Sequence, residues 1–258
     1  MDIKAKKSLG QNFLKDENIL KKIADSFSTT CDDVIIEIGP GQGALTKHLV
    51  EKNGHLICYE IDTRMESLLL HFESEDTSII FDDFLKRDIT QDIPLEHGSI
   101  YVIANIPYYI TTPIIEHVLA SGLDIAGMTL LVQKEVAERF CAMPGTKTYG
   151  YFTVYLKHFF ESESLFSVSP SCFTPAPKVM SEVVKLVKKE NRESIDINEF
   201  QVFLKDCFQN KRKTLRNNLK GYDWHKIESV LRTFANPNTV RAEELSYEEF
   251  VTIFKSLA

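Results

Sequence analysis

The sequence predicts a doubly wound α/β sheet followed by a small all-helical domain, on three observations. Short apolar runs typical of buried strands alternate with helical patterns between residues 34 and 132. A glycine-rich turn follows the first of these runs, and only helical patterns occur after about Lys189. Strands that alternate with helices favour a parallel sheet that carries helices on both faces.

The expected strands of this sheet are short and apolar. We place them at residues 34–38, 56–61, 78–81, 100–104 and 128–132. Helical patterns between them cover residues 44–52, 64–72 and 113–121. Two later apolar stretches, 153–160 and 182–187, are candidates for an edge hairpin that closes the sheet across the Pro-rich segment 170–177.

The second domain begins where the composition changes. Residues 188–196 are polar and predict a linker, and helical periods follow at 197–209, 213–219, 224–234 and 246–257. We therefore expect a catalytic domain over residues 1–189 and a helical domain over residues 190–258.

Composition excludes several classes of protein. With 258 residues, 43% hydrophobic and 26% charged, the chain suits one large domain and a small appendage. It has no apolar run of membrane-spanning length and no secretory apolar core behind Met1, so we expect a cytoplasmic protein. The five cysteines are scattered without a C-x-x-C pair, which argues against a disulfide framework or a metal site. Cys58 and Cys141 are expected to be buried filler rather than nucleophiles.

Charge is distributed unevenly along the chain. Residues 1–184 carry 16 basic and 26 acidic side chains, a balance of −10, whereas residues 185–258 carry 14 and 11, a balance of +3. Bases concentrate in residues 1–22 and 204–226. A polyanion would meet these two basic stretches, although each is equally compatible with a solvated helix face.

The glycine-rich turn predicts a cofactor site. Gly39, Gly41 and Gly43 stand at alternate positions after the first strand, which lets the backbone turn sharply and approach a ligand closely. Glu60 ends the second strand, where an acid accepts hydrogen bonds from a ribose diol. This pattern fits either NAD or S-adenosylmethionine, and it excludes a P-loop because no Gly-Lys-Ser/Thr follows.

The ends of the third and fourth strands favour S-adenosylmethionine. Asp83 is placed to accept a hydrogen bond from an adenine amino group, and Asn105-Ile106-Pro107-Tyr108 follows the fourth strand. The side-chain oxygen of Asn105 and a backbone carbonyl of Ile106 or Pro107 can accept hydrogen bonds from the N6 amino group of a substrate adenine. Pro107 stiffens that loop, and Tyr108 offers a face on which a base can stack.

With these motifs the chain resembles the KsgA family of ribosomal small-subunit adenine dimethyltransferases over nearly its whole length. The segments that carry the resemblance are Lys7–Leu14, Glu37–Thr46, Asn105–Tyr108, Gln133–Arg139, Pro144–Gly150, Phe173–Val179 and Lys211–Arg216. Two positions depart from the family pattern, since Ile106 replaces its usual leucine and Tyr109 its usual asparagine. An Asn-Ile-Pro core also occurs in related large-subunit rRNA methyltransferases of the macrolide-resistance type.

The resemblance implies a Rossmann-like methyltransferase sheet of seven strands with an antiparallel last hairpin. It implies that S-adenosylmethionine is contacted by Asn12, Leu14, Gly39, Glu60, Asp83 and Asn105, to which the glycine turn adds Gly41. It further implies that Phe173 stacks on the target adenine opposite Tyr108, and that the product is N6,N6-dimethyladenosine at two adjacent adenines.

Partners follow from the same resemblance and from the charge. We expect small-subunit rRNA within a pre-30S particle to be the substrate of a monomer, with RNA phosphates on Lys211, Arg212, Lys213 and Arg216. The alternatives are a large-subunit rRNA methyltransferase and a ribosome-assembly protein that binds RNA without catalysis. An NAD oxidoreductase is a further alternative, but no acid suited to hydride transfer is evident.

Overall fold

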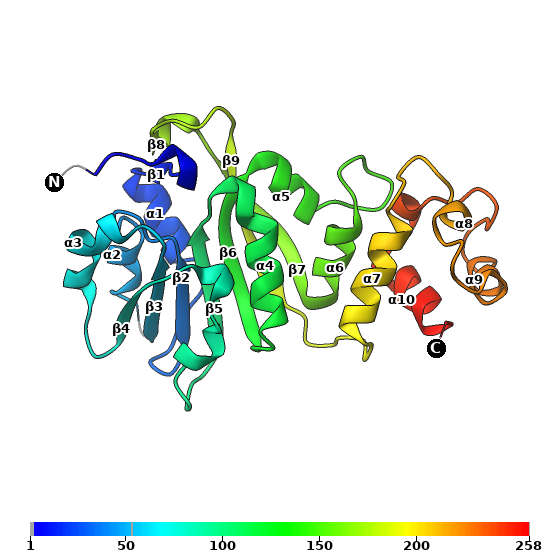
Figure 1. Cartoon of the computed structure of the whole chain (residues 1–258), viewed down its shortest axis with the longest axis horizontal. Helices are drawn as coiled ribbons and strands as arrows, with labels where there is room; N and C mark the ends of the chain where they lie inside the picture. The colour runs from blue at the N-terminus through cyan, green and yellow to red at the C-terminus, as the bar shows by residue number, and fades with distance from the viewer. Residues whose placement is uncertain (1–2, 53, 258) are drawn as a thin grey trace. The chain divides into compact units, whose positions relative to one another are not determined.

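The computed structural model describes residues 3–52 and 54–257, and of Lys7 and Tyr108 it describes the backbone alone. Two compact units form (Figure 1), one from residues 1–137 and 163–188 and the other from residues 138–162 and 189–258. The strands are β1 (Phe13–Leu14), β2 (Val34–Ile38), β3 (His55–Glu60), β4 (Thr77–Phe81), β5 (Ile100–Asn105), β6 (Ile125–Gln133), β7 (Phe160–Val168), β8 (Phe173–Thr174) and β9 (Ser181–Lys188). The α-helices are α1 (Glu17–Ala24), α2 (Thr46–Leu49), α3 (Glu66–Leu69), α4 (Thr111–Ala120), α5 (Lys134–Phe140), α6 (Tyr151–Phe159), α7 (Ile197–Cys207), α8 (Leu215–Asn218), α9 (Trp224–Leu231) and α10 (Tyr247–Lys255).

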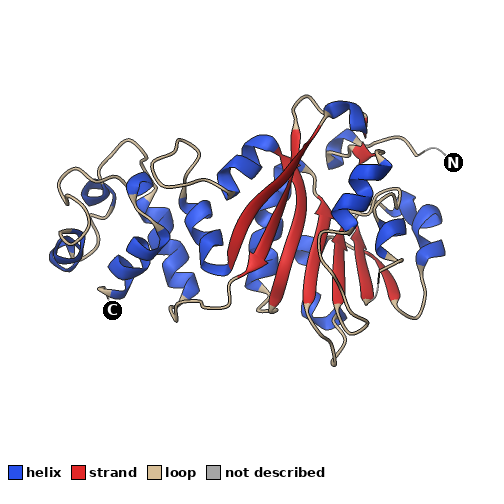
Figure 2. Cartoon of the chain, turned by 180° about the vertical axis from the view of Figure 1, so that it is seen from behind, coloured by secondary structure: helices blue, strands red, loops and turns tan. Residues whose placement is uncertain are grey.

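A seven-stranded sheet organises the first unit, in the order β4-β3-β2-β5-β6-β9-β7. β2 runs parallel to β3 on one side and to β5 on the other. The chain goes from β2 to β3 and β4 and then crosses back to β5, so the strand order reverses at β2. β9 runs antiparallel to β6, and β7 lies at the far edge beside β9. The strands stand side by side in Figure 2. The expected parallel sheet with a reversed last hairpin is therefore confirmed.

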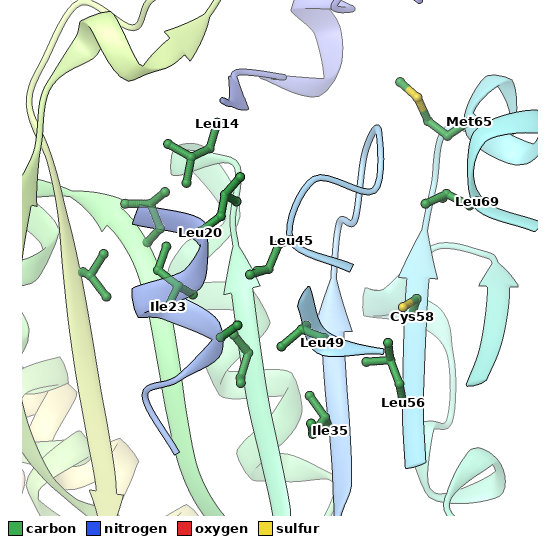
Figure 3. Packing of buried hydrophobic residues seen from close by; sticks show 14 of the residues in the cluster. Leu14, Leu20, Ile23, Ile35, Leu45, Leu49, Leu56, Cys58, Met65 and Leu69 are labelled. Carbon is green, nitrogen blue, oxygen red and sulfur yellow. The ribbon is translucent and has the colours of Figure 1, made fainter. Parts of the chain in front are cut away.

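One face of this sheet is covered by α1 and α2. α1 begins at Asp16, whose carboxylate accepts from the amides of Asn18 and Ile19 and so caps the first turn. Its apolar side chains pack on residues that alternate along the strands. Figure 3 shows this packing for Leu20, Ile23, Leu49, Ile35 and Leu56. The helix α2 is shorter than the helix expected at residues 44–52. The helix α1 was not predicted from the sequence.

The second unit is helical, and it includes a segment that the sequence led us to place in the sheet. Residues 153–160 were expected to form a strand, but residues 151–159 form α6. The whole stretch from Phe152 to Leu156 is buried, and a short run that is apolar on all sides has no period that separates helix from strand. The hairpin strand is instead β7, which begins at Phe160.

Contacts within the second unit explain why α6 belongs to it. His158 Nδ1 lies 3.0 Å from the hydroxyl of Tyr247 in α10, and the hydroxyl of Tyr149 donates to the carbonyl of Leu245 at 2.8 Å. The second unit takes up the chain again at residue 189, and residues 138–162 pack with the later helices. Helices α7, α9 and α10 form where helical periods were expected.

Across the described ranges, no helix combines the length and apolar character needed to cross a bilayer. The five cysteines all lie within the described residues, and none of them is in a disulfide bond; Cys58 is buried and Cys141 half-buried.

Candidate functional site

A cleft of about 1160 Å³, measured out to its open mouth, lies at the carboxyl edge of the parallel strands. It is lined by the residues that follow β2, β3, β4 and β5, together with residues 9–14 near the N-terminus. Because β2 has β3 on one side and β5 on the other, the cleft occupies the topological switch point where open α/β sheets bind ligands. Every expected cofactor residue, namely Asn12, Leu14, Gly39, Gly41, Glu60, Asp83 and Asn105, lines it.

The glycine turn forms the floor of the cleft. Gly39 and Gly41 have φ angles of 72° and 57°, in the left-handed region that favours glycine. A Cβ atom on Gly41 would lie 3.0 Å from Cε1 of Phe13, so a side chain there would push against the N-terminal segment. The contact with Phe13 therefore leaves little room for a side chain at Gly41.

Glu60 ends β3 with its carboxylate already held by the backbone. Its Oε2 accepts from the amide of Gly41 and its Oε1 from the amide of Asp62, both at 2.8 Å. The side chain is 4% exposed, and burial raises its pKa above the ordinary value. Each oxygen keeps a further lone pair, so the carboxylate can still accept from two ribose hydroxyls.

The charge of the cleft separates the two candidate cofactors. Four carboxyl groups line it, those of Glu37, Glu60, Asp82 and Asp83, and no Lys, Arg or His occurs among its described lining residues. Lys86 and Arg87, which lie outside this lining, pair with Asp83 and Asp82. The lining itself still favours a ligand with sulfonium and ammonium charges over the pyrophosphate of a dinucleotide. The residues present therefore fit S-adenosylmethionine rather than NAD.

Glu37, at the end of β2, is the most deeply buried of these acids. It is 1% exposed and accepts a hydrogen bond from the thiol of Cys58 at 3.4 Å. Burial raises its pKa from 4.5 to about 7. Sequence reasoning missed this contact, because Cys58 stands 21 residues further along the chain.

Apolar side chains flank Asp83. Its Oδ1 accepts from the amide of Leu85 at 3.2 Å, which fixes the turn after β4. Leu85 and Ile61 both line the cleft, and Ile61 is 53% exposed although it is apolar. An exposed isoleucine beside Glu60 suits the flat face of an adenine ring, and sequence reasoning missed it.

The motif after β5 has the geometry expected of a hydrogen-bond acceptor site. Nδ2 of Asn105 donates to the carbonyl of Asn12 at 3.4 Å, and none of the described residues donates to its Oδ1. The carbonyl of Pro107 accepts from the amide of Ile110 at 3.1 Å, which favours the carbonyl of Ile106 as the free backbone acceptor. The side chain of Tyr108 lies outside the described part of the chain.

Phe173 does not line the cleft. It pairs with Leu14 across the short β1–β8 ladder, and its side chain is 4% exposed within the core of the first unit. Its ring would have to be uncovered before a base could stack on it. Its stacking role therefore stays a prediction, next to a packing role that the structure displays.

The basic residues of the helical unit differ from one another. Arg212 and Lys213 are exposed, and no side-chain partner is recorded for either among residues 3–52 and 54–257. Nζ of Lys211, in contrast, donates to the carbonyl of Tyr149 at 3.0 Å, and the guanidinium of Arg216 lies 5.6 Å from the ring centroid of Trp224. Two of the four expected RNA contacts therefore also serve the fold.

Known proteins resemble this chain over nearly its full length. A family model described as ribosomal RNA adenine dimethylase matches residues 2–258. Proteins named ribosomal RNA small subunit methyltransferase A are 41% identical in Flavobacterium johnsoniae, over 99% of this chain and 96% of that protein, and 40% identical in Enterococcus faecalis, over 98% and 90%.

Two solved structures also superpose on this chain over most of its length. A dimethyladenosine transferase from Plasmodium falciparum superposes with a TM-score of 0.79 at 27% identity, covering 93% of this chain and 95% of that one. The 23S rRNA methyltransferase ErmE superposes with a TM-score of 0.73 at 25% identity, covering 95% and 99%.

Proposed function

Because the chain belongs to the ribosomal RNA adenine dimethylase family, we propose that it dimethylates N6 of two adjacent adenosines near the 3′ end of small-subunit rRNA. The observation that carries the proposal is Asn105, whose Oδ1 has no donor among the described residues at the rim of an acidic cleft. The names of the curated relatives support the small subunit as the substrate.

For this reaction the protein mainly has to position the reacting atoms. S-adenosylmethionine supplies an activated methyl group on a sulfonium. The adenine N6 is a poor nucleophile because its lone pair is delocalised into the ring. Asn105 Oδ1 and the carbonyl of Ile106 can accept both N6 hydrogens, which favours a nitrogen that is rehybridised for attack. Alignment of the reacting atoms contributes most of the rate, and the proton of the methylated nitrogen can leave to water.

The substrate adenine must leave its stack to reach Asn105. Tyr108, which directly follows Pro107, is the first candidate to hold the flipped base, and Phe173 is the second if its ring becomes exposed. Phosphates of the same RNA would meet Arg212 and Lys213, with Lys211 and Arg216 beside them. We expect a monomer that acts on a pre-30S particle in the cytoplasm.

The test is methylation of ribosomal subunits from cells that lack this methyl mark. Purified protein and S-adenosylmethionine are incubated with small and large subunits separately, and digested rRNA is examined by mass spectrometry. N6,N6-dimethyladenosine in the small-subunit rRNA, absent with Asn105→Ala, is the expected result.

The same assay addresses the alternative substrate. The likeness to ErmE and the Asn-Ile-Pro sequence favour large-subunit rRNA as the second candidate. Methylation confined to the large subunit would replace the proposal with that one. A protein that binds either subunit and methylates neither would be an assembly factor.

A further inference from the structure

Residues 9–14, called the strap here, run along the cofactor cleft. All six line the cleft. The ring of Phe13 lies against Gly41 of the glycine turn, and the carbonyl of Asn12 accepts from Asn105. The strap therefore touches both the glycine turn, on the proposed cofactor side, and Asn105, on the proposed methyl-transfer side.

The two ends of the strap are held differently. Leu14 is anchored by its pairing with Phe173 and by burial in the core. At the other end, Nε2 of Gln11 donates to Oδ2 of Asp62 at 2.9 Å, and Oε1 of Gln11 accepts from the amide of Lys6 at 2.8 Å. The amide of Gln11 thus bridges the strap to the residue that follows β3 by two positions.

Asp62 is built to receive that bond. Its side chain is 5% exposed, and Nε of Arg64 donates to its Oδ1 at 2.8 Å. The hydrogen bonds from Arg64 lower the pKa of Asp62 to about 2, so it is an anion at neutral pH. Its own amide donates to Glu60 Oε1 at 2.8 Å. One residue therefore holds the strap through its side chain and the ribose-binding acid through its backbone.

We propose that Gln11 and Asp62 form a latch that positions the strap over the cleft and sets how long S-adenosylmethionine stays bound. The proposal rests on the proposed function, since it takes S-adenosylmethionine as the ligand. Gln11 acts through the strap, so it is a positioning residue. Loss of a hydrogen bond to a charged acceptor should free residues 9–12 while Leu14 stays anchored.

The experiment measures binding of S-adenosylmethionine to the full chain by stopped-flow displacement with S-adenosylhomocysteine. Gln11→Ala should raise the dissociation rate about tenfold and leave the association rate within about twofold. Gln11→Glu, which sets a carboxylate against Asp62, should raise it further. In steady-state methylation, KM for S-adenosylmethionine should rise while kcat is kept. Gln91→Ala is the matched control, because Gln91 donates to Asp88 in a similar Gln–Asp pair that does not line the cleft.

A swapped pair separates the latch from a general effect on folding. In the double variant Gln11→Glu with Asp62→Asn, the new asparagine can donate to the new carboxylate, so the dissociation rate should return to within about threefold of the parent.

Equal dissociation rates for Gln11→Ala and Gln91→Ala would overturn the latch. So would a swapped pair no better than Gln11→Glu. A parent protein that binds no S-adenosylmethionine would instead remove the proposed function itself.

Discussion

The cofactor cleft and the basic segment of residues 210–216 offer a ligand opposite kinds of surface. Glu60 in the cleft and Asp62 beside it are buried, and their oxygens are already bonded to the backbone, to Arg64 or to the strap. In the basic segment, Arg212 and Lys213 are exposed to solvent. The cleft fixes geometry in advance, whereas Arg212 and Lys213 offer charge without fixed geometry. We therefore expect cofactor affinity to vary little with salt and RNA affinity to fall steeply.

The largest expected effect is at Asn105. Asn105→Ala removes the acceptor that we propose for the reacting nitrogen, and a loss of this kind costs about 10²–10³ in rate by analogy with oxyanion-hole donors. Single-turnover methylation of small subunits at saturating cofactor measures it. Some cofactor affinity should also be lost, because Asn105 donates to Asn12 of the strap. A rate within about threefold of the parent would make the Asn105–Tyr108 segment a simple turn.

Glu37→Gln tests how much a buried carboxyl group lowers the free energy of unfolding. Burial raises its folded-state pKa from 4.5 to about 7, so the stability it contributes is present below about pH 4.5 and is lost as the pH rises through 7. Glu37→Gln should remove a penalty of about 3 kcal/mol at pH 8 and flatten stability between pH 5 and 8. Urea unfolding at both pH values measures this, with the exposed Glu66→Gln as control. Parallel pH profiles for parent and Glu37→Gln would contradict it.

Glu60→Ala probes the proposed ribose contact directly. Each hydrogen bond from the ribose to this carboxylate contributes about 1.5–3 kcal/mol, so calorimetry should record a loss of at least that size in S-adenosylmethionine affinity. The folded state must be verified, because the amides of Gly41 and Asp62 lose their acceptor as well. Unchanged affinity in a folded variant would remove Glu60 from the site.

The smallest effects are expected for the basic residues, which should differ from one another in how far they change the salt dependence of RNA binding. Arg212→Gln and Lys213→Gln should each reduce the slope of log K against log salt by roughly 0.7–0.9 in RNA binding. Lys211→Gln should reduce it less, because Nζ of Lys211 is engaged by the carbonyl of Tyr149. Equal changes for all three variants would mean that this contact does not restrain Lys211, and no change would make the segment a solvated face.

Patterns within one segment could be predicted from the sequence, and contacts between distant segments could not. The strand at residues 34–38 and the acids after β3 and β4 were predicted because local apolar runs and turn chemistry specify them. Gln11 reaches Asp62 across 51 positions, and Ile61 is notable only because it is exposed inside a cleft. The prediction of a strand at residues 153–160 was wrong for a different reason. Burial on every side of this segment removes the hydrophobic period that marks a helix.

The acidic lining of the cleft has a consequence for turnover. When the methyl group is transferred, the sulfonium becomes a neutral thioether, and the ligand loses one positive charge while Glu37, Glu60, Asp82 and Asp83 remain. The cleft should therefore hold the spent ligand less tightly than the fresh one. Dimethylation of one adenine needs two such exchanges, and the same four carboxyl groups would favour both of them in the forward direction.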